Sequence, residues 1–323
     1  MAIRIGILGA AKIAPSAIIL PAQASDQFEV VAVGARDKSR AEHFAKKHDI
    51  PHVADGYAEL VEHADVDVVY NALPPNQHKR WTIAALKAGK PVLCEKPFAM
   101  NSAEARDMVS TAQAAELQLV EAFHYRFHRV MRRAIEIVRS GELGMLVEGE
   151  VTFAATIPYR PGELRWMSEL GGGAMMDLGC YCVHALRALS GEEPKIVNAE
   201  CDIARGVDEV TRANLAFPSG LRVSLCVAMN VPSGAMLRLK GKKGSLAISN
   251  FAAPQTGCRF TVETGGKIRE EPVCGPATYD EQLAHLGDVL LRGADPITSG
   301  EDVIANMAAI DAIYDAAGYV RKA

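Results

Sequence analysis

Short apolar runs alternate with amphipathic stretches along the first third of the chain. The runs are rich in β-branched residues, whereas the stretches between them repeat apolar positions at helical spacing, which predicts strands alternating with helices. Such alternation is typical of βαβ units around a parallel sheet. The predicted strands are Ile3–Leu8, Glu29–Val33, Val66–Ala72, Pro91–Cys94 and Leu117–Ala122. The predicted helices are Lys12–Ala24, Lys38–His48, Gln77–Ala88 and Ala103–Ala115, with Asn101 and Ser102 as the N-cap of the last.

Beyond Phe123 the pattern changes to long alternating runs joined by turns. Glycine-containing turns at 217–221 and 240–244 indicate hairpins, and strands joined by such turns pair antiparallel. We therefore expect one large, mainly antiparallel sheet with helices on one face. The predicted strands are Val147–Thr156, Ile196–Ala204, Glu209–Phe217, Leu221–Met229, Ala235–Lys240, Ser245–Ser249 and Arg259–Glu263. The predicted helices are His128–Arg139, Ala174–Leu189, Tyr279–Leu291 and Gly300–Gly318.

These patterns predict an α/β protein of two domains, which suits a chain of 323 residues. We place the boundary after residue 122, so that residues 1–122 bind a dinucleotide and residues 123–323 bind substrate and a second subunit. The last two helices can pack back on the first domain.

Composition narrows the functional classes. With 49% hydrophobic residues and no apolar run near the roughly 20 residues of a membrane span, nothing predicts a transmembrane protein. The N-terminus lacks the features of a signal peptide, and seven cysteines, an odd number, argue against a disulfide framework. We therefore expect a cytoplasmic location. The net charge of -4 gives no basic face for nucleic acid.

The first predicted strand runs into a turn of small residues. Gly9-Ala10-Ala11-Lys12-Ile13-Ala14 is a G-x-A-x-x-A form of the dinucleotide fingerprint, in which small residues let the backbone approach a pyrophosphate at a helix N-terminus. A plain strand-turn-helix with small residues remains the alternative, and Ala11 in place of the second glycine keeps it open.

The second predicted strand ends in Gly34-Ala35-Arg36-Asp37. Ala35 stands where an NAD enzyme carries an acid for the ribose 2′-hydroxyl, and Arg36 can pair with a 2′-phosphate. This favours NADP over NAD. The alternative is a solvated loop arginine beside Asp37.

Three further segments resemble the successive signatures of one family. They are Tyr70-Asn71-Ala72-Leu73-Pro74-Pro75-Asn76-Gln77-His78, Gly89-Lys90-Pro91-Val92-Leu93-Cys94-Glu95-Lys96-Pro97 and Gly171-Gly172-Gly173-Ala174-Met175-Met176-Asp177-Leu178-Gly179-Cys180-Tyr181. Their order and spacing resemble the glucose-fructose oxidoreductase and inositol dehydrogenase (Gfo/Idh/MocA) family over essentially the whole chain. Within it, Glu121–His128 is most similar to the branch of dimeric dihydrodiol dehydrogenases and NADP-dependent xylose dehydrogenases. The chain departs from the pattern at Ala11 and at His124, where methionine is usual.

The resemblance implies an N-terminal Rossmann domain and a C-terminal α/β domain whose open sheet forms an oligomer interface. It also implies the site residues. The residues expected at NADP are Gly9, Ala11, Lys12, Ile13, Arg36, Leu73, Pro74, Asn76, His78, Glu95 and Lys96. Those expected at the substrate are His124, Tyr159, Arg165 and Trp166. For Arg165 and Trp166 a packing or surface role is an equal alternative.

Three residues are expected to carry the chemistry. Hydride removal from an alcohol needs a base for the hydroxyl proton and a cation near the oxygen, and Lys96 and Tyr181 suit these roles. An unperturbed tyrosine has a pKa of ~10, so the Lys96 ammonium would have to lower it. Asp177 lies four residues before Tyr181 on the predicted helix, hence on the same face, and the resemblance assigns it to substrate orientation. A core aromatic is the alternative for Tyr181, and a loop lysine for Lys96.

No metal site is expected. Cys180, Cys182 and His184 lie near Tyr181, but consecutive residues diverge around a helix and the cysteine spacing matches no zinc pattern. His124 and His128 suit a pocket or surface better than a metal.

Together these features predict an NADP-dependent dehydrogenase acting on a secondary alcohol. The substrate that we expect first is an aldopyranose oxidised at its anomeric carbon, and the next candidate is a trans-dihydrodiol. The alternatives are a non-catalytic NADP-binding regulator and a reductase of a tetrapyrrole or imine. We further expect a homodimer or larger homo-oligomer, because Val223, Leu225, Val227 and Met229 form an apolar stripe that needs either a partner or helices of its own domain.

Overall fold

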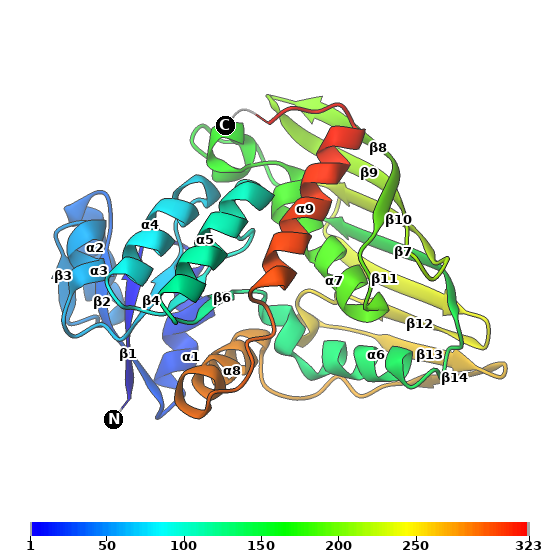
Figure 1. Ribbon diagram of the computed structural model, residues 1–323, viewed down its shortest axis with the longest axis horizontal. Coiled ribbons are helices and arrows are strands. Elements are labelled where there is room, and N and C mark those ends of the chain that lie inside the picture. The colour runs from blue at the N-terminus through cyan, green and yellow to red at the C-terminus, as the bar shows by residue number, and fades with distance from the viewer. Residues whose placement is uncertain (1, 322–323) are drawn as a thin grey trace. The chain divides into compact units, whose positions relative to one another are not determined.

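The computed structural model describes residues 2–321, which divide into two compact units. The first unit comprises the chain up to Phe123 together with Tyr279–Ile304, and the second comprises His124–Thr278 and the chain from Ala305 onward. Each unit is built around one sheet (Figure 1). No helix within the described residues is both long and apolar enough to cross a membrane.

The sheet of the first unit has six parallel strands in the order β3-β2-β1-β4-β5-β6, so the predicted parallel α/β fold is confirmed. The order reverses between β1 and β4, which is where ligands bind in such sheets. The strands are β1 Ile3–Leu8, β2 Phe28–Gly34, β3 His52–Ala54, β4 Val68–Asn71, β5 Val92–Cys94 and β6 Leu119–Glu121. Their apolar side chains and the helices on both faces form one core.

Helices flank this sheet (Figure 1). Asp37 caps the helix after β2 by accepting from the Ser39 N–H, and Asn101 caps the helix before β6 by accepting from the Glu104 N–H. The Asn101 cap was predicted. The helices are α1 Leu20–Gln23, α2 Lys38–His48, α3 Tyr57–Glu62, α4 Pro75–Lys87, α5 Ser102–Ala114 and α8 Thr278–Arg292, whose first residue belongs to the second unit.

The helix predicted over Lys12–Ala24 is wrong as a single α-helix. A π-helical segment covers Pro15–Ile19, and α1 is only four residues long. Pro21 has no N–H to donate to the preceding turn, which disrupts regular α-helical bonding at this point. Three short elements, β3, α3 and β14 Lys267–Glu270, were not predicted because each is too short or too polar to show a period.

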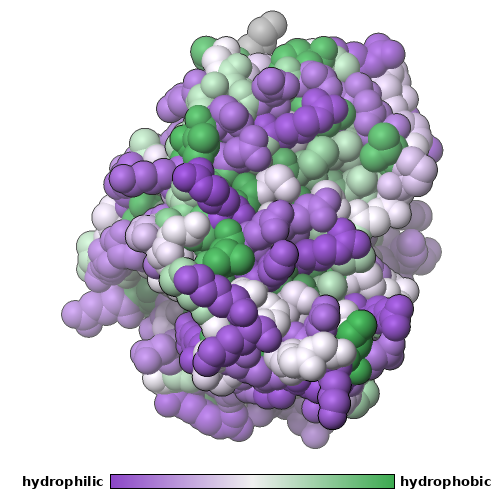
Figure 2. All heavy atoms as spheres, turned by 90° about the vertical axis from the view of Figure 1, so that its right-hand side faces the viewer, coloured by the Kyte–Doolittle hydropathy of each residue, from purple (hydrophilic) through white to green (hydrophobic). Residues whose placement is uncertain are grey.

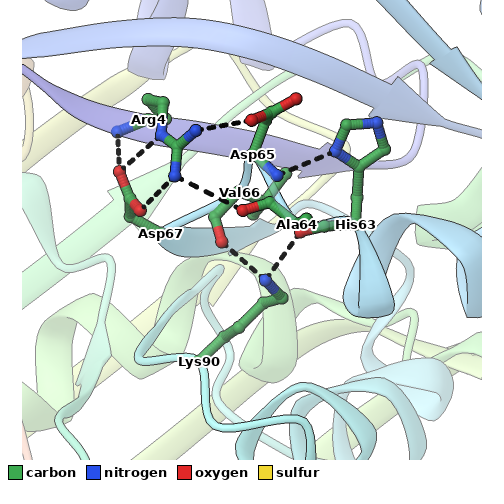
Figure 3. A network of polar contacts seen from close by, with 7 residues as sticks. All are labelled: Arg4, His63, Ala64, Asp65, Val66, Asp67 and Lys90. Atoms are coloured by element: carbon green, nitrogen blue, oxygen red, sulfur yellow. Dashed lines mark hydrogen bonds and ion pairs between the residues drawn. The ribbon is translucent and has the colours of Figure 1, made fainter.

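A polar network joins the segment before β4 to the start of β1 (Figure 3). The Arg4 guanidinium pairs with Asp65 and Asp67, and the Lys90 ammonium donates to the backbone carbonyls of His63 and Val66 at 2.8 and 2.5 Å. Burial lowers the pKa of Lys90. Because residues 63–67 precede β4, Arg4 lies at the start of β1 and Lys90 precedes β5, the network joins the amino ends of three strands.

The sheet of the second unit has eight strands in the order β14-β13-β12-β11-β7-β10-β9-β8. All neighbours pair antiparallel except β7 and β10, which pair parallel, so the predicted mainly antiparallel sheet is confirmed. The hairpins predicted at 217–221 and 240–244 join β9 to β10 and β11 to β12. The remaining strands are β7 Leu146–Ala154, β8 Lys195–Ala204, β9 Val207–Ala216, β10 Arg222–Ala228, β11 Gly234–Gly241, β12 Gly244–Ser249 and β13 Phe260–Thr264.

Helices cover one face of this sheet and bury its apolar side chains (Figure 1). Val223, Leu225, Val227 and Met229 are each at most 2% exposed in the single chain, so they form no exposed stripe for a partner. The alternative raised for them, cover by helices of their own domain, is what the structure shows. The helices are α6 Arg129–Arg139, α7 Cys180–Ser190, which a π-helical segment Met175–Gly179 precedes, and α9 Glu301–Ala316, which begins in the first unit.

Among the described residues, no helix covers the other face of the sheet (Figure 1). Hydrophilic, weakly apolar and strongly apolar side chains are mixed on this face (Figure 2). Glu150, Arg212 and Ser224 are among the residues around a shallow hollow on it. Ion pairs cross between its strands, with Arg212 paired to Asp202 and Arg238 to Glu150. This open face is therefore mixed, with charged pairs among exposed apolar side chains such as Val197 and Ile203 of β8.

Candidate active site

The turn after β1 in the first unit has the backbone of a dinucleotide site. Gly9 adopts φ +97°, a conformation that side chains disfavour, and a Cβ there would meet the Leu73 side chain at 3.0 Å. Within residues 2–321, the N–H groups of Ala11, Lys12 and Ile13 donate to no protein group. Free N–H groups at the start of a helix suit a pyrophosphate, so this turn fits the cofactor despite Ala11.

The end of β2 fits the 2′-phosphate of NADP. Ala35 is buried and Arg36 is exposed directly after it, and neither residue is an acid that would repel a phosphate. A shallow hollow between Ala10 and the first turns of α2 is lined in part by Ser39 and Arg40. The side chains here therefore offer positive charge and hydroxyl donors.

The loop after β4 contributes backbone and one polar side chain. The Asn76 Oδ1 atom is buried and has no hydrogen-bond partner among the described residues, so a bound donor would satisfy it. His78 lies wholly buried, with Nε2 2.7 Å from the Leu73 carbonyl oxygen and Nδ1 3.1 Å from that of Pro97. Burial lowers the pKa of His78 to about 4. His78 thus holds two loops together through its ring nitrogens.

In the segment after β5, the buried carboxylate of Glu95 holds the backbone of Lys96. The Tyr70 hydroxyl donates to Glu95 Oε1 at 2.7 Å, and Glu95 Oε2 accepts from the Lys96 backbone N–H at 3.2 Å. Burial, reinforced by the Glu95 charge, raises the pKa of Tyr70 well above its ordinary value. Glu95 and Tyr70 therefore fix the backbone that carries Lys96. Lys96 follows the carboxyl end of β5, the strand that pairs with β4.

In the second unit, Tyr181 belongs to a buried aromatic and histidine cluster. His124 Nε2 lies 3.0 Å from the Tyr181 hydroxyl, and His124 Nδ1 lies 2.7 Å from Thr278 Oγ1. The Tyr125 hydroxyl lies 2.6 Å from His184 Nδ1, and its ring centroid is 5.5 Å from that of Tyr181. Tyr181 is thus a buried aromatic whose hydroxyl is held by an ionisable side chain.

Asp177 forms a separate group with the loop before the glycine triplet. Arg165 Nε donates to Asp177 at 2.7 Å and its Nη1 to Glu163 at 3.0 Å, and the Asp177 charge raises the pKa of the guanidinium. Asp177 lies in the π-helical segment, so the simple α-helical spacing to Tyr181 does not apply. The two side chains take different hydrogen-bond partners.

The aromatic residues of the same loop pack together. Trp166 Nε1 donates to the Ile157 carbonyl, and its ring meets the edge of Tyr159 at 6.1 Å between centroids. The Arg205 guanidinium lies over the Tyr159 ring, with its Cζ 4.2 Å from the ring centroid. Trp166 is buried and Tyr159 exposed, so of these two Tyr159 is the one presented to solvent.

Asp208 of β9 anchors the start of the helical segment that carries Asp177 and Tyr181. Its carboxylate accepts from the Met175 N–H at 2.7 Å, from the Thr211 hydroxyl at 2.7 Å and from the Tyr314 hydroxyl at 2.8 Å. Burial raises the pKa of Asp208 against the opposing effect of these donors. A Cβ at Gly173 would meet Asp208 Oδ1 at 2.0 Å, which explains a glycine at that position.

Sequence reasoning missed Thr278, Glu163 and Asp208. The first two are ordinary polar residues whose partners appear only in the folded chain, and Asp208 is 106 residues from Tyr314. Asp208 had no distinct sequence signal, because the strand around it, Val207–Ala216, contains several other polar residues. His128, assigned to a pocket or surface, caps α6 by accepting from the Val130 N–H. Among residues 2–321, no three His, Cys, Asp or Glu side chains gather as a metal site.

Two family models match the chain. Residues 3–123 match the oxidoreductase family with an NAD-binding Rossmann fold, and residues 131–247 match the GFO/IDH/MocA C-terminal domain. The D-xylose 1-dehydrogenase (NADP(+)) 2 of Haloferax volcanii is 31% identical over 97% of this chain and 96% of its own. The trans-1,2-dihydrobenzene-1,2-diol dehydrogenase of Mus musculus is 36% identical over 79% of this chain and 77% of its own.

Solved structures agree with these matches. The aldose-aldose oxidoreductase of Caulobacter crescentus, solved with glycerol, superposes with a TM-score of 0.91 at 29% identity and covers 98% of both chains. The 3-ketoreductase KijD10 of Actinomadura kijaniata, solved with NADP and TDP-benzene, gives 0.89 at 27% identity, again over 98% of both chains. Since both domain models and near full-length relatives match, the chain belongs to the Gfo/Idh/MocA family of oxidoreductases.

Proposed function

We propose that this protein is an NADP-dependent dehydrogenase that oxidises a secondary alcohol of a sugar, polyol or dihydrodiol. The observation that carries the proposal is the buried Tyr181 hydroxyl, held 3.0 Å from a histidine nitrogen, in a chain whose first unit has the turn and the charge for NADP. A protein that only binds the cofactor has no need of such an arrangement. The xylose and dihydrodiol dehydrogenases among its relatives support the same class of reaction.

NADP, when bound, supplies the acceptor for the hydride. The chain's own residues would handle the proton and the orientation of the substrate. Tyr181 as tyrosinate would take the hydroxyl proton, and the Lys96 ammonium would hold the substrate oxygen. Asp177 and Arg165, already paired with each other, offer an acceptor and donors to neighbouring hydroxyls.

For the substrate, an aldose oxidised to a lactone comes first and a trans-dihydrodiol second. The polar side chains of the second unit favour this order, because Asp177, Arg165 and the exposed Tyr159 can hydrogen-bond several hydroxyls. The xylose dehydrogenase relative covers more of this chain than the dihydrodiol dehydrogenases do. The domain roles follow, with residues 1–122 binding NADP and residues 123–323 binding substrate and a second subunit in a cytoplasmic homo-oligomer.

The test is turnover with NADP across aldoses, inositols and dihydrodiols, followed by absorbance of the reduced cofactor. Lys96→Met and Tyr181→Phe should each lower the rate about 10²- to 10⁴-fold while cofactor binding persists. The double variant should be little slower than the slower single variant, because groups that act together are non-additive. Lys87→Met and Tyr57→Phe are matched controls in the first unit, at an exposed and a half-buried position respectively.

Two results would count against the proposal. NADP binding without turnover of any compound would favour a regulatory protein. Near-normal turnover of Tyr181→Phe would require another base.

A further inference from the structure

We propose that His124 accepts the proton from Tyr181 and so returns the tyrosine to its basic form after each oxidation. The inference rests on the proposed role of Tyr181. His124 does not need to touch the substrate, because its Nε2 lies 3.0 Å from the Tyr181 hydroxyl. His124 is 7% exposed and Tyr181 is 6% exposed, so the contact is largely shielded from water.

The partner of the other ring nitrogen makes the exchange possible. Thr278 Oγ1 lies 2.7 Å from His124 Nδ1 and also accepts from Gln255 Nε2 at 3.2 Å. A hydroxyl has one proton and two lone pairs, so Thr278 keeps one of each for His124 after accepting from Gln255. It can therefore donate to a bare Nδ1 or accept from a protonated one. Each charge state of the imidazole keeps a hydrogen bond on both sides.

One proton passes from the substrate to Tyr181 and then to His124 in each oxidation. The alcohol loses a hydride from carbon to NADP and a proton from oxygen to the tyrosinate, which becomes a phenol. The phenol O–H of Tyr181 then breaks as an N–H forms on His124 Nε2, with Nδ1–H donating to Thr278. The imidazolium releases one proton to water or buffer, so each alcohol oxidised yields one proton.

A second tyrosine and histidine pair lies beside the first. Tyr125 and His184 are joined at 2.6 Å, and Tyr125 packs against the Tyr181 ring. Tyr125 therefore contacts the His124–Tyr181 pair through its ring, and His184 contacts Tyr125. His184 lies three residues beyond Tyr181 on α7 and makes its bond to a different hydroxyl. It is a matched control for the loss of a buried histidine.

The first test separates proton transfer from positioning. In His124→Gln the amide can still hydrogen-bond to Tyr181 but cannot take a proton, and the oxidation rate should fall roughly tenfold to a hundredfold. In His124→Gly, added imidazole should restore the rate at least about tenfold in a concentration-dependent manner. His184→Gln should remain within about threefold of the unchanged protein, because its partner Tyr125 is not the base.

The second test needs no cofactor. Nitrogen-15 NMR of the cofactor-free protein, with the His124 signal assigned by its loss in His124→Gln, should show the Nε2 shift moving in Tyr181→Phe, while the His184 signals stay in place. Wild-type turnover of His124→Gln, or a His124→Gly variant that imidazole does not rescue, would overturn the inference. Near-normal turnover of Tyr181→Phe would instead overturn the proposed function, and the NMR coupling would still report on the pair.

Discussion

At the scale of single residues, we expect one charge, that of Arg36, to favour NADP over NAD. Arg36 is exposed at the end of β2, directly after the buried Ala35 that replaces the acid of an NAD site. We expect a guanidinium there to pair with the 2′-phosphate of NADP and to gain little from the 2′-hydroxyl of NAD.

Arg36→Ala should therefore weaken NADP binding about 10- to 100-fold, and NAD binding by less than about threefold, because a hydrogen bond to a charged group contributes about 1.5–3 kcal/mol. Titration of each cofactor by calorimetry measures the two constants. Lys47→Ala removes the same charge from the other end of α2 and should change neither constant. Equal weakening of both cofactors by Arg36→Ala would refute the assignment.

Among the elements, the helical segment with Asp177 and Tyr181 depends most on a buried anchor. Asp208 cannot swing aside, because the Met175 N–H, Thr211 and Tyr314 all donate to its carboxylate. Gly173 adopts φ +117°, and a Cβ there would meet Asp208 Oδ1 at 2.0 Å. Both the backbone and the available space require glycine.

Gly173→Ala should consequently lower the free energy of unfolding by about 3 kcal/mol or more, as the sum of left-handed backbone strain and overpacking. Gly220→Ala is the control, because Gly220 has φ +93° but no atom within 4 Å of its Cβ position. It should lose only about 1–2 kcal/mol. Urea unfolding measures both variants, and equal losses would show that the Asp208 contact is unimportant.

At the scale of the whole molecule, the two faces of the second sheet bear on assembly. The apolar stripe of β10 is buried under helices of its own chain, so it supplies no reason to associate. The sheet face that no described helix covers carries both charged and apolar side chains (Figure 2). We propose that association through this face depends in part on its paired charges.

Light scattering at micromolar concentration should give a dimer mass or a larger one. Arg212→Glu places a second negative charge beside Asp202 on this face and should weaken association by about tenfold or more. Lys47→Glu makes the same charge change on α2 of the first unit and should leave the mass unchanged. A monomer mass for the unchanged protein would refute the oligomer.

Local patterns were sufficient for much of this protein. The alternation of strands and helices, the Asn101 cap and the turns at 217–221 and 240–244 depend on residues close together in sequence, so the sequence alone predicted them. The Gly9 turn belongs with them, because its positive φ is a property of one residue. Pro21 was also visible in the sequence. Its disruption of the helix could not be predicted, because that depended on which residue began the helical hydrogen bonding.

Contacts between distant residues were decided only by the tertiary structure. The sequence carries no periodic trace of the parallel pairing of β7 with β10 or of what covers the β10 stripe. It also carries none of the bond from His124 to Thr278, 154 residues away. The sequence by itself determined the family, the parallel fold and the residue types of the site, because these depend on local propensity and on motifs. Which histidine meets Tyr181, and which carboxylate anchors its helix, depended on packing. Many placements satisfy the same hydrophobic pattern, whereas buried polar groups such as His124 and Asp208 need particular partners.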